Sequence, residues 1–236
     1  MTGRRFLTGS GSDAETLVID GEEYHHLARV MRARRGMEIE AVNGRGDWFL
    51  ARITRMVKGR AEALVLRRQR EECRPTRLII APSILRKRPM DLMLEKLCEL
   101  GVDEIRPVCF NRSDTDCLEE VPDRWRRVAL QAIKVNRRLW PTRILPPTDV
   151  SALLKTCTGI PGRLVLEITG PVMDPDTDTT PLLCVIGPPG DFADEEITAL
   201  KKAGFAPWRI NPGVLRTETA AIAAAAMLQR LLIPGS

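Results

Sequence analysis

The chain has 236 residues, of which 44% are hydrophobic and 28% are charged. This balance indicates a globular protein, because disordered chains combine low hydrophobicity with high net charge. No apolar run approaches the ~18 residues that a membrane-spanning helix needs, and the start of the chain lacks the features of a signal peptide. We therefore expect a cytoplasmic protein of two unequal domains.

Cysteine and histidine usage argues against disulfides and metal sites. The six cysteines never form a Cys-x-x-Cys pair, and the only histidines are the adjacent His25 and His26. Cytosolic thiols stay reduced, and adjacent residues on a strand point to opposite faces. We expect no disulfide, no structural zinc ion and no catalytic metal.

Positive charge is concentrated in two parts of the chain. The whole net charge of +5 lies in residues 1–70, and residues 124–148 contain seven basic side chains and no acidic one. Such clusters attract phosphate backbones, although a run of charge can also be a solvated face. The distribution favours a nucleic acid as partner.

The N-terminal part alternates short β-rich runs with glycine turns. A small β-barrel is predicted over residues 1–70, with strands at residues 16–19, 38–42, 48–53 and 61–66. Residues 22–32 have apolar positions at helical spacing. They predict a short helix that plugs the barrel, with Arg29 and Arg32 facing outward.

Strands and helices alternate after the polar segment 67–77. The pattern predicts an α/β domain over residues 76–236, with a parallel sheet covered by helices. Buried strands are expected at residues 78–81, 105–110, 164–168 and 182–186, and helices at 89–100 and 123–134.

Two turns follow predicted strands and therefore lie at the edge where open α/β sheets bind ligands. The first covers residues 186–192, and its glycines let backbone amides approach a ligand closely. The second covers residues 210–220 and leads into an alanine-rich helix at 221–232, whose slender surface suits close packing at a subunit interface. Both turns could instead be tight connections, with Thr217 as a helix cap.

Several motifs of the C-terminal half occur together in a specific order. They are Ile186-Gly187-Pro188, Gly190, Phe192, Glu196-Ile197, Gly204-Phe205 and Leu215-Arg216-Thr217-Glu218-Thr219-Ala220. In this combination the chain resembles the small-subunit (16S) ribosomal RNA uracil N3-methyltransferase family, which belongs to the SPOUT superfamily of trefoil-knotted methyltransferases. The resemblance extends over almost the whole chain, because the segment from His26 to Arg32 and Glu99-Leu100-Gly101-Val102 also match.

The resemblance implies a PUA-like RNA-binding barrel in residues 1–70 and a SPOUT knotted α/β methyltransferase domain in residues 76–236. It also implies S-adenosylmethionine as cofactor, a homodimer, and ribosomal RNA or the small ribosomal subunit as partner. The expected cofactor-binding residues are Leu166, Glu167, Ile186, Gly187, Pro188, Gly190, Ile210, Asn211, Pro212, Val214, Leu215 and Thr217.

The expected reaction is direct attack by the uracil nitrogen N3 on the cofactor's methyl group. Arg216 would stabilise the negative charge of the deprotonated base, and Glu218 is a weaker candidate as proton acceptor. The expected RNA-binding residues are Arg4, Arg5, Arg29, Arg32, Arg112, Arg137 and Arg138.

The chain also departs from the family's pattern. Pro189 and Asp191 replace the usual glutamate and last glycine of the first turn, Lys134 replaces an acidic residue, and residues 210–213 differ from the usual Leu-Gly-Pro-Arg. These changes leave two alternatives open, a methyltransferase for another RNA base or a ribose, and an inactive ribosome-binding relative. A dehydrogenase or nucleotide hydrolase is disfavoured, because the chain has neither Gly-x-Gly-x-x-Gly nor a P-loop.

Overall fold

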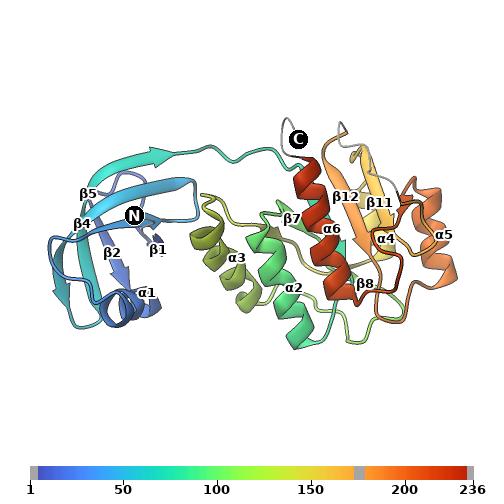
Figure 1. Cartoon of the computed structure of the whole chain (residues 1–236), viewed down its shortest axis with the longest axis horizontal. Helices are drawn as coiled ribbons and strands as arrows, with labels where there is room; N and C mark the ends of the chain where they lie inside the picture. Colours follow the sequence, from blue (N-terminus) through green and yellow to red (C-terminus); the bar gives the residue numbers. More distant parts are fainter. Residues whose placement is uncertain (1–4, 173–178, 233–236) are drawn as a thin grey trace. The chain divides into compact units, whose positions relative to one another are not determined.

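The computed structural model describes residues 5–172 and 179–232. The chain forms two compact units (Figure 1). The first consists of Met1–Arg74 and Leu130–Pro141, and the second of Pro75–Ala129 and Thr142–Ser236. Helix α3, Asp123–Asn136, begins in the second unit and ends in the first. None of the helices in the described ranges is long and apolar enough to cross a membrane.

The first unit is built on one five-stranded sheet in the order β1-β3-β4-β5-β2. All neighbouring strands are antiparallel except β1 and β3, which run parallel. The four predicted strands are confirmed, and β1 is an additional strand that pairs with β3. The strands are β1 (Arg5–Leu7), β2 (Thr16–Asp20), β3 (Glu38–Val42), β4 (Asp47–Val57) and β5 (Arg60–Arg70).

A short helical segment packs against this sheet and contributes to its core, as predicted. It consists of α1 (Gly21–His25) and a π-helical turn, η1 (His26–Val30), which is the part that the periodicity did not reveal. Leu27 is fully buried in a cluster with Phe6 and Phe49. Arg29 and Arg32 are exposed, so the predicted outward orientation is confirmed.

The segment 130–141 returns to the first unit. Ile133 and Leu139 are buried together with Val42 of β3, and the backbone N–H of Gly46 donates to the Leu139 carbonyl at 3.1 Å. The sequence pattern does not reveal this return, because the apolar positions of α3 have the same helical spacing whichever unit they face.

The second unit contains a six-stranded, fully parallel sheet in the order β13-β11-β12-β6-β7-β9. Two further short strands, β8 (Val108–Cys109) and β10 (Thr148–Asp149), pair with each other. The six strands are β6 (Leu78–Pro82), β7 (Glu104–Ile105), β9 (Arg143–Ile144), β11 (Gly162–Leu166), β12 (Leu182–Ile186) and β13 (Ala206–Trp208).

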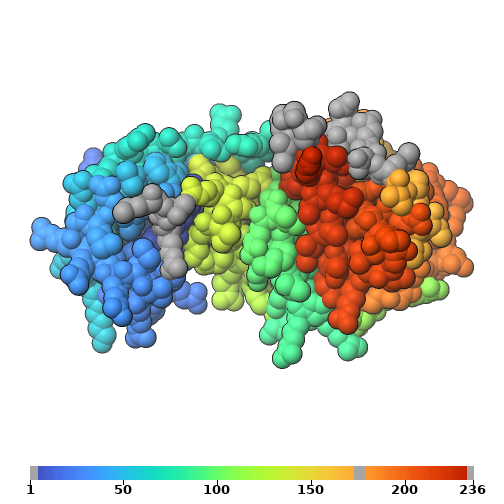
Figure 2. All heavy atoms as spheres, viewed as in Figure 1, coloured from blue at the N-terminus to red at the C-terminus, as the bar shows by residue number. Residues whose placement is uncertain are grey.

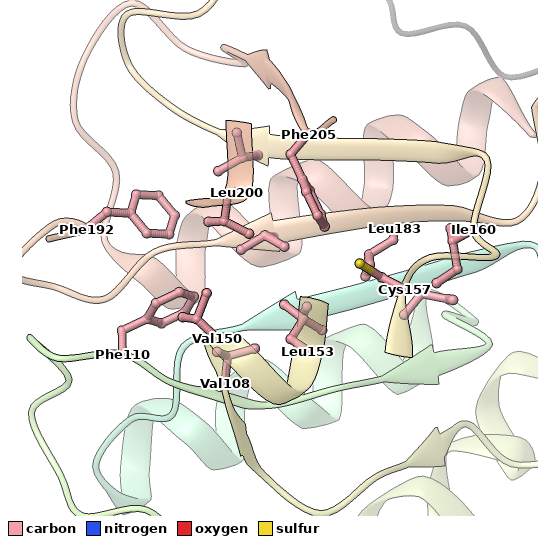
Figure 3. Packing of buried hydrophobic residues seen from close by; sticks show 14 residues of the cluster. Val108, Phe110, Val150, Leu153, Cys157, Ile160, Leu183, Phe192, Leu200 and Phe205 are labelled. Carbon is pink, nitrogen blue, oxygen red and sulfur yellow. The ribbon is translucent and has the colours of Figure 1, made fainter. Parts of the chain in front are cut away.

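Helices cover both faces of this sheet, as the alternating pattern predicts. Helices α2 (Lys87–Glu99) and α6 (Thr217–Leu231) lie side by side (Figure 2). Helix α6 also contacts β6 and β12. The other face packs against α4 (Val150–Thr156) and α5 (Asp194–Lys202) through a buried apolar cluster (Figure 3). Within each strand, alternate residues face the two helical layers, which explains the continuous apolar runs.

The strand expected at residues 105–110 is wrong as a single strand. Pro107 divides it into β7, which joins the six-stranded sheet, and β8, which pairs with β10. A proline has no N–H to donate to a neighbouring strand, so the ladder cannot continue through this position.

The expectation that the chain has no disulfide is also wrong. Cys109, at the end of β8, is bonded to Cys117, and their Cα atoms lie 5.6 Å apart. The spacing of eight residues gave no motif, but the chain folds back between them and brings the two side chains together. The bond closes a loop that includes Phe110, Asn111 and Arg112.

Candidate active site

A cavity of about 720 Å³ lies at the carboxyl ends of the parallel strands of the second unit. Its walls are the segments that follow β6, β11, β12 and β13, together with the first turn of α6. Because these strands are parallel, their carboxyl ends meet at one edge of the sheet, where α/β proteins bind ligands. The volume is in the range of small-molecule and cofactor sites.

The structure brings most of the predicted site residues together at this cavity. The two predicted catalytic residues, Arg216 and Glu218, line it. Gly190 and Pro212 are not among the lining residues. The predicted cofactor-binding residues that line it are Leu166, Glu167, Ile186, Gly187, Pro188, Ile210, Asn211, Val214, Leu215 and Thr217.

The turn after β12 and the start of α6 are joined directly. The hydroxyl of Thr217 donates to the carbonyl oxygen of Gly187 at 3.0 Å. A Cβ atom at Gly187 would lie 2.9 Å from the ring of Phe192, which is closer than side chains pack. Only glycine therefore fits in this turn as it is folded.

The start of α6 differs from the expected cap. Arg216, not Thr217, occupies the N-cap position, with extended backbone (φ −64°, ψ 150°), and its carbonyl accepts the first helical hydrogen bond from Ala220 at 2.8 Å. Thr217 is the first helical residue, and its hydroxyl binds the Gly187 carbonyl instead of capping the helix. The exposed Arg216 side chain thus lies at the positive end of a 15-residue helix, a location that favours an anion.

Acidic side chains outnumber basic ones around the cavity. The bases are Arg209 and Arg216, and the acids are Asp114, Glu167, Asp191, Asp194 and Glu218. Glu167 is held in an ion pair with Lys201 at 2.9 Å. This excess of negative charge suits a ligand with net positive charge. In the described part of the chain, no three His, Cys, Asp or Glu side chains come together as a metal site.

Sequence reasoning missed Arg209 and the conformation of Asp191. Within the described residues, the buried Nε of Arg209 has no hydrogen-bond partner. Asp191 is held in the left-handed region, at φ +64°. Arg209 follows β13 directly, but Ala206-Pro207-Trp208 does not have the pattern of a strand. The glycine that the family has in place of Asp191 was the available signal for a positive φ.

The predicted RNA-binding residues are divided between the units. Arg29, Arg32 and Arg137 are exposed in the first unit, and Arg138 is half-buried there. Arg112 belongs to the second unit, where it donates to backbone carbonyls. Arg4 lies outside the described residues.

Arg5 is engaged inside the first unit. Its side chain is only 11% exposed and pairs with Glu40 at 3.1 Å, and the indole N–H of Trp48 donates to the same carboxylate at 3.0 Å. Burial alone raises the pKa of Glu40, but the hydrogen bonds from Trp48 and Arg5, with the charges of Arg5 and Arg137, hold it below the usual value. Glu40 therefore stabilises the fold in its ionised form.

Lys134, a departure from the family's pattern, has a partner of opposite charge. Its ammonium group lies 2.6 Å from a carboxylate oxygen of Glu23, which also accepts from Gln131 at 3.3 Å. The other oxygen of Glu23 accepts from the backbone N–H of Leu7 at 3.1 Å. Lys134 thus fastens segment 130–141 to the rest of the first unit.

Family models identify both parts of the chain. The model described as an RNA methyltransferase domain matches residues 72–229, and the model described as an RNA methyltransferase PUA domain matches residues 19–66. The fold and the cavity at the sheet edge are those of an RNA methyltransferase with a PUA-like N-terminal domain. The chain belongs to this RNA methyltransferase family.

Curated relatives and solved structures agree with this assignment. The ribosomal RNA small subunit methyltransferase E of Mycobacterium bovis is 29% identical over 88% of this chain and 83% of its own length. The Neisseria gonorrhoeae enzyme of the same name, solved bound to S-adenosyl methionine, is 26% identical, has a TM-score of 0.82, and matches over 97% of this chain and 98% of its own. A Legionella pneumophila protein solved with bound SAM has a TM-score of 0.80, is 25% identical, and matches over 97% and 98%.

Glu40→Gln should lower the free energy of unfolding of the first unit and make that free energy less dependent on pH under acidic conditions. Because folding lowers the pKa of Glu40, the stabilisation by its carboxylate is present above the unfolded pKa near 4.5. It is lost as the pH falls from this value through the lower pKa of the folded protein. We expect a loss on the order of 1 kcal/mol at pH 7, measured by denaturant unfolding, and a smaller further loss between about pH 5 and 3.

Glu38→Gln is the matched control, because Glu38 is on the same strand and forms an exposed pair with Arg52. Surface pairs contribute little to stability, so this variant should behave as wild type. If the free energy of unfolding depended on pH equally in wild type and Glu40→Gln, ionised Glu40 would not stabilise the first unit.

Proposed function

We propose that the protein transfers a methyl group from S-adenosylmethionine to N3 of a uridine in small-subunit (16S) ribosomal RNA, in the cytoplasm. The names of the curated relatives and the SAM-bound solved relatives support the substrate and the cofactor. The observation that carries the proposal is the cavity at the carboxyl edge of the sheet, whose two glycine-containing turns are joined by the Thr217 hydrogen bond to Gly187.

The cavity's chemistry fits this cofactor. Leu85, Leu166 and Ile186 provide apolar wall for an adenine ring, and the close backbone at Gly187 leaves peptide groups available for its polar edge. The acidic excess suits the cofactor's net positive charge, and the Nε of Arg209, which has no partner among the described residues, is a donor for its carboxylate. Bound S-adenosylmethionine supplies an electrophilic methyl group.

The chain's own residues position the uracil and stabilise its charge. N3 loses its proton to solvent water, and the resulting negative charge spreads onto the neighbouring carbonyl oxygens until the bond between N3 and the methyl carbon forms. Arg216 and the N-terminal end of α6 face the cavity, where they stabilise such an anion. Glu218 also lines the cavity and contributes to its shape and its negative charge.

RNA is held by the exposed arginines of the first unit, Arg29, Arg32 and Arg137, together with Arg138. Such side chains bind phosphates without reading sequence. The PUA-domain match over residues 19–66 supports this role.

The active form is a homodimer. Val214 and Ile168 line the cavity although they are 86% and 45% exposed, and a second copy over this rim would bury them. Light scattering at micromolar concentration should give twice the monomer mass of 26.4 kDa, and the monomer mass itself would rule the dimer out.

Calorimetry on the purified protein tests the cofactor site. Wild type should bind S-adenosylmethionine, and Gly187→Ala should bind it about tenfold more weakly or worse, because the new methyl group meets the Phe192 ring and displaces the turn. Gly159→Ala is the control, since no atom of the described residues lies within 4 Å of a Cβ there. Absence of binding by wild type at millimolar cofactor would refute the proposed function.

Single-turnover methylation separates chemistry from RNA binding. Arg216→Ala should slow methyl transfer by about 10²-fold at saturating RNA, because it removes an interaction made in the transition state. Arg29→Ala and Arg138→Ala should weaken RNA binding and lower its salt dependence by about one phosphate contact each, with the rate recovered at high RNA concentration.

Arg230→Ala is the control for Arg216→Ala, because Arg230 is exposed at the opposite end of the same helix. An intact single-turnover rate in Arg216→Ala would place the chemistry elsewhere.

A further inference from the structure

The loop closed by the Cys109–Cys117 disulfide packs against the turn that follows β12. The backbone N–H of Asn111 donates to a carboxylate oxygen of Glu196 at 2.7 Å, and its side-chain amide donates to Glu195 at 3.0 Å. Glu196 is buried, and its other oxygen accepts from the backbone N–H of Ala193 at 2.9 Å. The loop is thus fixed to the start of α5.

An aromatic contact holds the two segments at a second point. The rings of Phe110 and Phe192 meet edge to face, with centroids 5.2 Å apart and planes at 83°. Both belong to the buried cluster between the sheet and helices α4 and α5 (Figure 3). Such a pair contributes beyond the area that it buries.

Arg112 completes the contact with two hydrogen bonds. One guanidinium nitrogen, Nη1, donates to the carbonyl of Phe192 at 3.1 Å and lies 3.4 Å from that of Gly190. A Cβ at Gly190 would be only 3.2 Å from Cβ of Arg112, so the two backbones approach closely. The two carbonyls belong to the residues immediately before and after Asp191.

Asp191 is the residue that needs this support. Its φ is +64°, a backbone conformation that residues other than glycine rarely adopt. Such a conformation persists where contacts with the surrounding structure hold the residue in place. One carboxylate oxygen accepts from the backbone N–H of Phe192 at 2.8 Å. Asp191 lines the cavity together with Gly187 and Pro188 of the same turn.

We propose that Arg112 is a positioning residue of the cofactor site: by binding the carbonyls on both sides of Asp191, it holds the 187–192 turn in its cofactor-binding conformation. The inference rests on the proposed function, since the turn is taken as part of an S-adenosylmethionine site. It assigns Arg112 to the cofactor rather than to RNA, although Arg112 was among the expected RNA-binding residues.

Calorimetry with S-adenosylmethionine, beside RNA affinity measured at several salt concentrations, tests this assignment. Arg112→Ala and Arg112→Lys should each bind the cofactor about tenfold more weakly, the scale of one lost hydrogen bond to a charged group. Lysine keeps the charge, but its single nitrogen is one bond closer to the backbone than Nη1 of arginine, so it does not reach the two carbonyls that Nη1 holds. RNA affinity and its salt dependence should match wild type in both variants, and Lys202→Ala, an exposed cation at the end of α5, should change neither.

A variant with glycine at position 191 tests whether Arg112 acts by supporting the backbone conformation of Asp191. Glycine adopts a positive φ without help, so in an Asp191→Gly protein the further change Arg112→Ala should weaken cofactor binding much less than it does in wild type. An equal loss in both backgrounds would overturn the proposal.

The proposal also fails if Arg112→Ala lowers RNA affinity and its salt dependence while cofactor binding stays at the wild-type value. It fails independently of the proposed function, because these comparisons require a wild-type protein that binds S-adenosylmethionine. A wild type that does not bind it contradicts the proposed function itself.

Discussion

The hydrogen bond between the Thr217 hydroxyl and the Gly187 carbonyl connects two segments that are 30 residues apart in the chain. It is possible only because β12 and β13 are parallel strands of one sheet whose carboxyl ends meet at the same edge. It also requires glycine at 187, where the Phe192 ring leaves no room for a side chain. The junction joins two walls of the cavity and fixes the start of α6, next to Arg216, against the turn that follows β12.

The two units differ in the charge that they offer to a ligand. The net positive charge of the chain lies in residues 1–70, whereas the cavity of the second unit has more acidic than basic side chains. A polyanion such as RNA is attracted to the first unit, and a cationic cofactor to the second. Arginines also have structural roles here, since Arg5 pairs with a partly buried carboxylate and Arg112 holds a turn. A count of basic residues therefore overstates the number that are available to RNA.

Elements with a strong local pattern could be predicted from the sequence. The strands at 38–42 and 182–186 have the predicted bounds, because alternation marks the first and a continuous apolar run marks the second. Strand β13 could not be predicted, since three residues with a central proline become a strand only by pairing with β11. The same holds for the return of segment 130–141, which depends on contacts distant in sequence.

In the candidate site, too, local features could be predicted from the sequence and contacts between distant segments could not. Residues next to strand ends could be expected at one edge of the sheet, because parallel topology alone brings them together there, and most of them line the cavity. The partners of Arg5, Arg112 and Lys134 could not be predicted, because each lies in a segment far away in the sequence. Asp191 could be predicted only in part. The family's glycine at this position indicated a special backbone conformation, but it did not indicate the contacts that maintain this conformation.

The central claim is that this fold methylates N3 of a uridine in 16S ribosomal RNA. Mass spectrometry of nucleolytic fragments of 16S RNA, from cells with and without the gene, tests it most directly. The account predicts one uridine that carries a methyl group on N3 in the first sample and none in the second. Identical methylation in both samples, or a difference confined to a ribose or to another base, would contradict it.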